Sequence, residues 1–242
     1  MRIAVTGATG RVGPYIVEAL RAQGHDVVEI ARSKGVDVIT GEGLAEALAG
    51  AEVIVDAATG PSPDYEQAKA FFTTSARNIL AHAKDARRIV VLSIIGVDRF
   101  QGGYNAAKLA QERAYQAGPV PVKILRAAQF HEFVGQLLDW GTQNGVGYMW
   151  EMQTQLVSAK VVGEQVAKLV DGDAPEITEV AGPRVESMVE AARLVAAKRG
   201  APATVQGAPA PADAELYENG GALPGPGAVL AGPSFEEWLR AQ

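Results

Sequence analysis

Short apolar runs alternate with helical patterns along the first half of the chain. The runs are four to six residues long and rich in Val and Ile, which is typical of strands buried on both faces of a parallel sheet. We expect five such strands, at residues 2–6, 26–31, 53–57, 89–93 and 122–126, with a weaker one at 36–39. Helices are predicted between them, from residue 12 onward, at 65–83 and at 106–117. This alternation predicts an α/β fold with a doubly wound parallel sheet, the Rossmann fold.

The alternation of strand and helix patterns becomes less regular after Gln129. We expect a loop at 141–150, a short strand followed by a helix within 156–170, and a helix at 187–199. Residues 200–232 are rich in Pro and Gly and predict a wrapping loop. Ser234 and Glu237 have the spacing of a capping box for a last helix. We therefore expect a core at 1–130 and a smaller C-terminal region at 131–242, packed together as one compact unit.

Composition removes several classes of function. The net charge is −6 and the sequence pI is about 5.2, which argues against a general nucleic-acid or anionic-membrane surface. The chain has no cysteine, so disulfides, thiolate catalysis and zinc–thiolate sites are excluded. The three histidines show no metal-ligand spacing, and we expect no metal site. No signal-peptide pattern and no apolar stretch of ~18 residues is present, so we expect a soluble, cytoplasmic protein.

The stretch GATGRVG places Gly7, Gly10 and Gly13 between the first strand and the first helix. A diphosphate at a helix N-terminus meets free backbone N–H groups and a partial positive charge, and side chains would block its approach. The spacing is GxxGxxG rather than GxGxxG, and a purely structural turn is the alternative. We predict dinucleotide binding by the whole turn, that is, by Gly7, Ala8, Thr9, Gly10, Arg11, Val12 and Gly13.

The end of the second strand indicates which dinucleotide is bound. NAD sites usually carry a carboxylate there for the ribose 2′-hydroxyl, whereas here Arg32 and Ser33 follow the strand and Glu29 lies inside it. A guanidinium and a hydroxyl suit a 2′-phosphate, so we expect NADP (NADPH). An ordinary solvated arginine is the alternative.

The third group of candidate cofactor residues is small and lies where the strand at 53–57 ends. Ala57, Ala58 and Thr59 would leave a gap at the carboxyl edge of the sheet in which a nucleotide could lie. Simple close packing is the alternative. We count these three residues among the predicted cofactor contacts.

Candidate chemistry follows the strand at 89–93. Ser93 ends this strand, and Tyr104 and Lys108 lie four residues apart on one face of the next helix. A neighbouring ammonium would lower the pKa of the phenol, so that Tyr104 could act as proton donor while Lys108 also held the nicotinamide ribose. Ser93 could then orient a substrate carbonyl. A solvated helix face is the alternative for the Tyr–Lys pair.

Residues after the strand at 122–126 could line the substrate side. Gln129, Phe130 and His131 leave the sheet near the expected nicotinamide position. Core or lid packing is the alternative for Phe130 and for the nearby Phe133. An aromatic wall or an apolar lid is expected from Trp140, Tyr148, Met149 and Trp150.

Together these stretches resemble the atypical short-chain dehydrogenase/reductase family, and more narrowly its NmrA-like NAD(P)-binding branch. The resemblance is carried by GATGRVG, ARS, VDAATG, ARNIL, VVLSIIGVDR, YNAAKLAQE, ILRAAQFHEF and FEEWL. It implies a dinucleotide-binding Rossmann core at 1–130, a substrate-binding or lid region at 131–242, and NADP held by the glycine turn, Arg32 and Ser33. It also matches Ser93, Tyr104 and Lys108 to the catalytic Ser, Tyr and Lys of the family. Asn78 resembles the asparagine of the extended catalytic tetrad.

Two functions follow from this interpretation. The first is an NADPH-dependent oxidoreductase that reduces a small carbonyl or quinone-like molecule. The alternative, which the NmrA-like branch implies, is a non-catalytic NAD(P) redox sensor that acts on a protein partner. Epimerase or dehydratase chemistry on a nucleotide sugar is a weaker third, because the C-terminal half shows no obvious basic cluster to clamp a second diphosphate.

Overall fold

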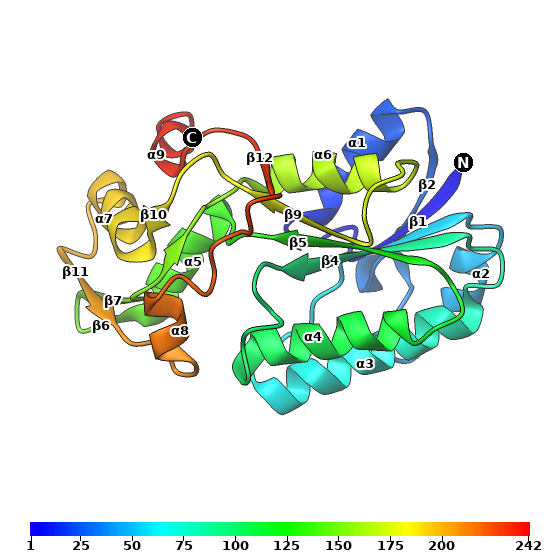
Figure 1. Cartoon of the computed structure of the whole chain (residues 1–242), viewed down its shortest axis with the longest axis horizontal. Coiled ribbons are helices and arrows are strands. Elements are labelled where there is room, and N and C mark those ends of the chain that lie inside the picture. Colours follow the sequence, from blue (N-terminus) through cyan, green and yellow to red (C-terminus); the bar gives the residue numbers. More distant parts are fainter.

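The computed structural model describes residues 1–242 and is built around one parallel sheet of seven strands (Figure 1). Their order across the sheet is β12-β9-β5-β4-β3-β1-β2. The strands are β1 (Arg2–Thr6), β2 (Asp26–Ile30), β3 (Val53–Asp56), β4 (Arg88–Ile94), β5 (Val122–Ala127), β9 (Ile177–Ala181) and β12 (Val229–Leu230). The predicted doubly wound α/β fold is confirmed.

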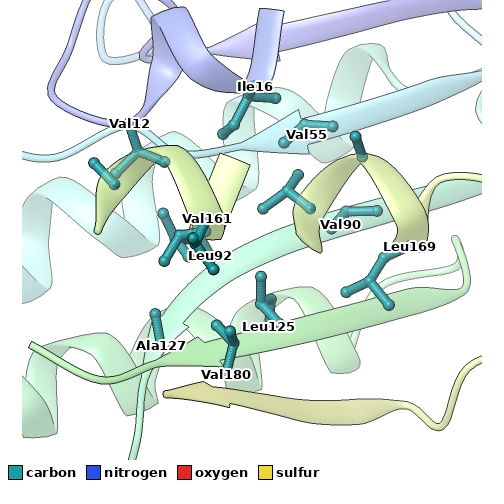
Figure 2. Close-up of a cluster of buried hydrophobic side chains, with 14 of the residues drawn as sticks. Val12, Ile16, Val55, Val90, Leu92, Leu125, Ala127, Val161, Leu169 and Val180 are labelled. Carbon is teal, nitrogen blue, oxygen red and sulfur yellow. The ribbon is translucent and has the colours of Figure 1, made fainter. Parts of the chain in front are cut away.

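Helices cover both faces of this sheet, which is why its strands read as continuous apolar runs. Figure 1 shows α1 (Gly13–Ala22) and α6 (Ala159–Leu169) on one face, and α3 (Tyr65–His82) and α4 (Gly103–Gln116) on the other. Along β4, Val90 and Leu92 join the core under α1 and α6, while Ile89 and Val91 join the core under α3 and α4. Figure 2 draws the first of these cores, with labelled side chains of α1, α6 and the strands converging on one another. Burial of each such aliphatic side chain contributes about 1.5–3 kcal/mol.

The remaining elements form a lobe beyond the carboxyl ends of β4 and β5 (Figure 1). Its helices are α5 (His131–Gly141), α7 (Met188–Arg199), α8 (Ala214–Glu218) and α9 (Phe235–Arg240). Its strands are β6 (Thr142–Gln143), β7 (Val146–Trp150), β8 (Gln153–Thr154), β10 (Glu186–Ser187) and β11 (Thr204–Ala208). The lobe has its own apolar core, in which Leu138, Met149, Met188 and Phe235 are buried. We call these elements the C-terminal lobe.

The sheet does not end at residue 130, the boundary expected from the sequence. Helix α6 and strands β9 and β12 return from the second half of the chain to the core, because β9 pairs with β5 and β12 pairs with β9. Two short elements, η1 (Arg32–Lys34) and α2 (Leu44–Leu48), complete the connection from β2 to β3. None of the helices combines the length and the apolar character that crossing a membrane requires.

Three local predictions are wrong for identifiable reasons. Residues 36–39 form no strand, because the Asp37 carboxylate accepts the Ile39 amide at 2.7 Å and bends the chain. The loop expected at 141–150 is the β6–β7 hairpin, turned by Asn144 and Gly145 at φ of 52° and 79°, the Asn-Gly signal of a tight hairpin. The loop expected at 200–232 contains β11, α8 and β12. The capping box of Ser234 and Glu237 is confirmed.

Candidate functional site

The glycine turn lies where the strand order reverses. Strand β1 pairs with β2 on one side and with β3 on the other, and such a switch point leaves a crevice at the carboxyl edge of the sheet. Gly7 has φ of +68°, and a Cβ there would lie 2.6 Å from the Ala57 carbonyl oxygen. A Cβ on Gly13 would lie 2.2 Å from the Gly7 carbonyl oxygen. Both positions therefore require glycine for the turn to close between β3 and α1.

This turn leaves backbone donors free. The Gly10 amide donates to the Gly7 carbonyl at 2.9 Å, but the amides of Arg11, Val12 and Gly13 donate to no protein acceptor. No side chain caps the N-terminus of α1. Three N–H groups and the positive end of the helix dipole are thus available to an anion.

At the end of β2, the structure places the predicted 2′-phosphate residues on the surface. Arg32 and Ser33 are exposed in η1, and the Arg32 side chain makes no hydrogen bond or ion pair with protein. Glu29, the nearby carboxylate, is paired with Arg21 at 2.8 Å and with Lys34 at 3.5 Å. The hydrogen bond from Arg21 is the main reason why the pKa of Glu29 lies below its ordinary value. A free guanidinium therefore stands beside a neutralised carboxylate.

The small residues after β3 have mixed surroundings. Ala58 is buried, Ala57 is half-buried against the backbone of Gly7, and only Thr59 is exposed. Close packing thus explains why Ala57 and Ala58 are small. Thr59 is the one side chain of the three that reaches solvent at the edge of the sheet.

A buried polar network supports the glycine turn after β1 and the loop after β3. The carboxylate of Asp56, fully buried at the end of β3, accepts hydrogen bonds from Thr6, from Gln111 at 2.8 Å and from Tyr115 at 2.7 Å. It also accepts the Ala58 amide at 3.1 Å. Because one carboxylate binds all four donors, the ends of β1 and β3 are held in fixed register with α4. Sequence reasoning missed this network, and the Asp in VDAATG was its only local signal.

Lys108 belongs to the same network and not to the exposed edge. Its Nζ donates to the Leu92 carbonyl at 2.6 Å and to the Gln111 side chain, and lies 4.6 Å from the centre of the Phe72 ring. The side chain is buried between α4, α3 and β4, and this burial lowers the pKa of Lys108 to about 8. The structure thus places the ammonium in the interior.

Tyr104 and Ser93 lie near Lys108 without being joined to it. Tyr104 packs edge-on against Phe72 at 5.5 Å and makes no hydrogen bond to Ser93 or Lys108. Burial raises the pKa of Tyr104 to about 12, so the expected lowering by Lys108 is wrong. Strand alternation puts Ser93 on the face of β4 that carries α3 and α4, where its Oγ is buried without a partner.

The residues expected on the substrate side are scattered. His131 is buried in the C-terminal lobe, with Nε2 3.0 Å from the Leu156 carbonyl oxygen, and burial lowers its pKa to about 4. Trp140 and Tyr148 are exposed, Trp150 is half-buried and Met149 is buried. The residues expected to form an aromatic wall therefore do not form one surface.

The C-terminal lobe instead reaches the site through Tyr217 of α8. The Asn105 side chain donates to the Tyr217 hydroxyl at 2.6 Å, and the Tyr217 ring lies 4.5 Å from that of Phe100 and 6.1 Å from that of Trp150. Asn105 follows Tyr104 in the first turn of α4, so this contact holds α8 against the N-terminus of α4. The sequence offered no signal for it, because Tyr217 lies in the Pro- and Gly-rich segment.

Asn78 has a structural explanation. Its side-chain amide donates to the carbonyl oxygens of Val38 and Ile39, at 2.9 and 2.8 Å. It therefore fixes the bend between β2 and α2 from its place on α3. These bonds account for the asparagine without a role in the reaction.

Comparisons with known proteins agree with this geometry. A family model described as NAD(P)H-binding matches residues 7–170. L-arabinose 1-dehydrogenase (NAD(P)(+)) of Haloferax volcanii is 43% identical over 70 residues, which cover 26% of this chain and 27% of that enzyme. The chain thus matches only about a quarter of this relative's length.

Solved structures resemble the whole chain. A dTDP-4-dehydrorhamnose reductase from Clostridium acetobutylicum has a TM-score of 0.76 at 19% identity, covering 100% of this chain and 98% of that chain. The Bacillus anthracis dTDP-4-dehydrorhamnose reductase, in complex with NADP, has a TM-score of 0.73 at 16% identity, covering 100% and 99%. The Bordetella bronchiseptica enzyme WbmH, in complex with NAD+, has a TM-score of 0.68 at 16% identity, covering 99% and 91%. At these identities the likeness is one of fold.

Proposed function

The chain belongs to the NAD(P)H-binding family, and on that premise we propose that it is an NADPH-dependent oxidoreductase that reduces a small carbonyl or quinone-like substrate. The observation that carries this proposal is the set of unpaired amides at Arg11, Val12 and Gly13, which lie at the switch point of the sheet. A diphosphate fits the donors that this turn presents. The motifs that resemble the NmrA-like branch support a place in that branch.

The cofactor specificity rests on the end of β2. The Arg32 side chain has no protein partner, while Glu29 is held by Arg21 and Lys34. A 2′-phosphate would therefore meet a free guanidinium and the Ser33 hydroxyl, without repulsion from an unpaired carboxylate. We propose NADPH as the cofactor, bound by the glycine turn, by Arg32 and Ser33, and along the edge formed by Ala57, Ala58 and Thr59.

The proposed reaction divides between cofactor and protein. When bound, NADPH would supply the hydride that the carbonyl carbon of the substrate accepts. Tyr104 donates a proton to the carbonyl oxygen, and its raised pKa keeps it protonated at neutral pH. Ser93, whose hydroxyl has no partner in the protein, orients the same oxygen. Lys108 fixes α4 on β4, because its ammonium donates a hydrogen bond to the Leu92 carbonyl. To contact a ribose, the ammonium would have to break this hydrogen bond.

The test is NADPH oxidation, followed by absorbance, with a panel of carbonyls and quinones. The panel includes dTDP-4-dehydrorhamnose, because two structural neighbours are named as its reductases. Tyr104→Phe should lower turnover about 100-fold or more and leave the NADPH affinity within about twofold. Tyr148→Phe, at an exposed tyrosine, is the matched control. Full activity of Tyr104→Phe, or loss of NADPH binding, would contradict the assigned role.

A second candidate is a redox sensor that acts on a protein partner. Two observations favour it. Ser93, Tyr104 and Lys108 are not joined by hydrogen bonds, and Lys108 is buried away from the edge of the sheet. A sensor should bind NADP+ and NADPH with different affinities and oxidise NADPH with no member of the panel. Its Tyr104→Phe variant should behave as the wild type does.

A further inference from the structure

Arg11 connects the glycine turn with the C-terminal lobe. Its Nη1 donates to the Glu132 carbonyl at 2.9 Å, and its Nη2 donates to the Gln136 side chain. The guanidinium carbon lies 5.9 Å from the centre of the Phe133 ring. All three partners belong to the first two turns of α5. One side chain of the turn thus anchors the helix that opens the C-terminal lobe.

The charge of Arg11 is not neutralised by these contacts. Both acceptors are neutral, and no carboxylate forms an ion pair with Arg11. The carboxylate of Glu132 is turned to the N-terminus of α6, where its two oxygens accept the Ala159 amide at 3.2 and 3.1 Å. By contrast, the buried Arg126 is paired with two carboxylates. Arg11 therefore holds an unpaired positive charge against the start of α5, on the side chain of a residue whose own amide is free.

The guanidinium of Arg11 also has N–H donors that α5 does not use. Arginine has five N–H groups in a planar fork, and α5 uses two of them. The other donors and the charge remain for an anion that sits on the turn. A diphosphate has oxygens to accept both from the main-chain amides and from a guanidinium.

We propose that Arg11 clamps the cofactor diphosphate from the side of the C-terminal lobe and couples cofactor binding to the position of α5. The inference rests on the proposed function, because it assumes that a dinucleotide binds. It differs from the role of Arg32, since the diphosphate is common to NAD and NADP whereas the 2′-phosphate is not. Arg11 therefore contributes affinity without selectivity, and it links the turn to the lobe.

Paired affinity measurements test the clamp. Arg11→Met should weaken NADP+ and NAD+ by the same factor, about ten- to a hundredfold, as expected for loss of a charge-assisted contact. Gln136→Leu keeps the charge and removes one anchor on α5, and it should weaken both dinucleotides by a smaller, equal factor. Arg113→Met, at an exposed arginine on α4 without a side-chain partner, is the control and should change neither affinity.

Hydrogen–deuterium exchange supplies a readout that does not depend on affinity. NADPH at saturation should slow exchange of the amides of residues 131–141 in the wild type, and should do so much less in a folded Arg11→Met variant. Wild-type affinity for both dinucleotides in Arg11→Met, or a loss confined to NADP+, would overturn the inference and leave the proposed function standing. A wild-type protein that binds no dinucleotide would overturn both.

Discussion

The substitution Gly10→Ala should weaken cofactor binding while leaving the free energy of unfolding nearly unchanged. Gly10 has no positive φ, and a Cβ there would approach only the Gly7 carbonyl oxygen, at 3.1 Å. Gly7 differs, because its φ is +68° and its Cβ would lie 2.6 Å from the Ala57 carbonyl oxygen. A methyl group at Gly10 would therefore require the Gly7 carbonyl to shift by about a few tenths of an ångström in the absence of cofactor, whereas one at Gly7 would overlap the backbone of Ala57 and Ala58.

The expected magnitudes follow from this difference. At Gly10 the slight contact is offset by the reduced entropy of the unfolded chain, so the free energy of unfolding should change by less than about 1 kcal/mol. The methyl group would nevertheless stand where the diphosphate must approach the amides. Loss of one or two charge-assisted hydrogen bonds, at about 1.5–3 kcal/mol each, means roughly tenfold weaker NADPH binding or more. Gly7→Ala should cost about 2–5 kcal/mol of stability from its left-handed backbone and the overlap with the end of β3.

Two assays on the same samples measure the effects of these substitutions on stability and on NADPH affinity. Urea denaturation gives the free energy of unfolding, and NADPH fluorescence gives the dissociation constant. Gly227→Ala is the matched control, because its Cβ would have nothing within 4 Å and its φ is not positive. A stable Gly10→Ala variant with wild-type NADPH affinity would show that the diphosphate does not lie on this turn. Destabilisation of Gly10→Ala as large as that of Gly7→Ala would refute the packing argument.

Three further outcomes are expected. Arg32→Ala should weaken NADP+ about ten- to a hundredfold and NAD+ little, measured by calorimetry; equal loss of both would refute the 2′-phosphate assignment. Glu112→Gln should cost about 3–5 kcal/mol in urea denaturation, because it leaves the buried Arg126 poorly paired, whereas Asp98→Asn at the exposed partner should cost under about 1 kcal/mol; similar losses would contradict this ranking. Burial lowers the pKa of His131 to about 4, so the unfolded chain binds more protons between about pH 6.5 and pH 4, and stability should fall as the pH drops through this window. His131→Leu should flatten that dependence in chemical denaturation, and an unchanged pH profile would count against the assignment.

The core can be predicted because its signals are local. The five main strands lie within one residue of their predicted ends, since short runs of Val and Ile between turn residues are typical of strands buried on both faces. Strand β9 escapes prediction because Thr178 and Glu179 interrupt its apolar character. The β6–β7 hairpin has a usable signal in Asn144 and Gly145, which the interpretation of 141–150 as a loop overlooks.

The candidate site is harder to predict because its contacts are long-range. Spacing correctly implies that Tyr104 and Lys108 share one face of a helix, but it cannot show that Lys108 faces β4 and Phe72. The partners of Asp56 come from residues 6, 111 and 115, and only the fold brings them together. The contact of Arg11 with α5 spans more than a hundred residues and has no signature in the local sequence.

Calorimetric titration of the folded wild-type protein with NADPH, and with NADH for comparison, tests the central claim most directly. If the main-chain amides of the glycine turn hold a diphosphate and Arg32 holds a 2′-phosphate, the heats should fit one site per chain, with tighter binding of NADPH. Absence of heat with either coenzyme, from protein shown to be folded by its cooperative urea transition, would contradict the claim.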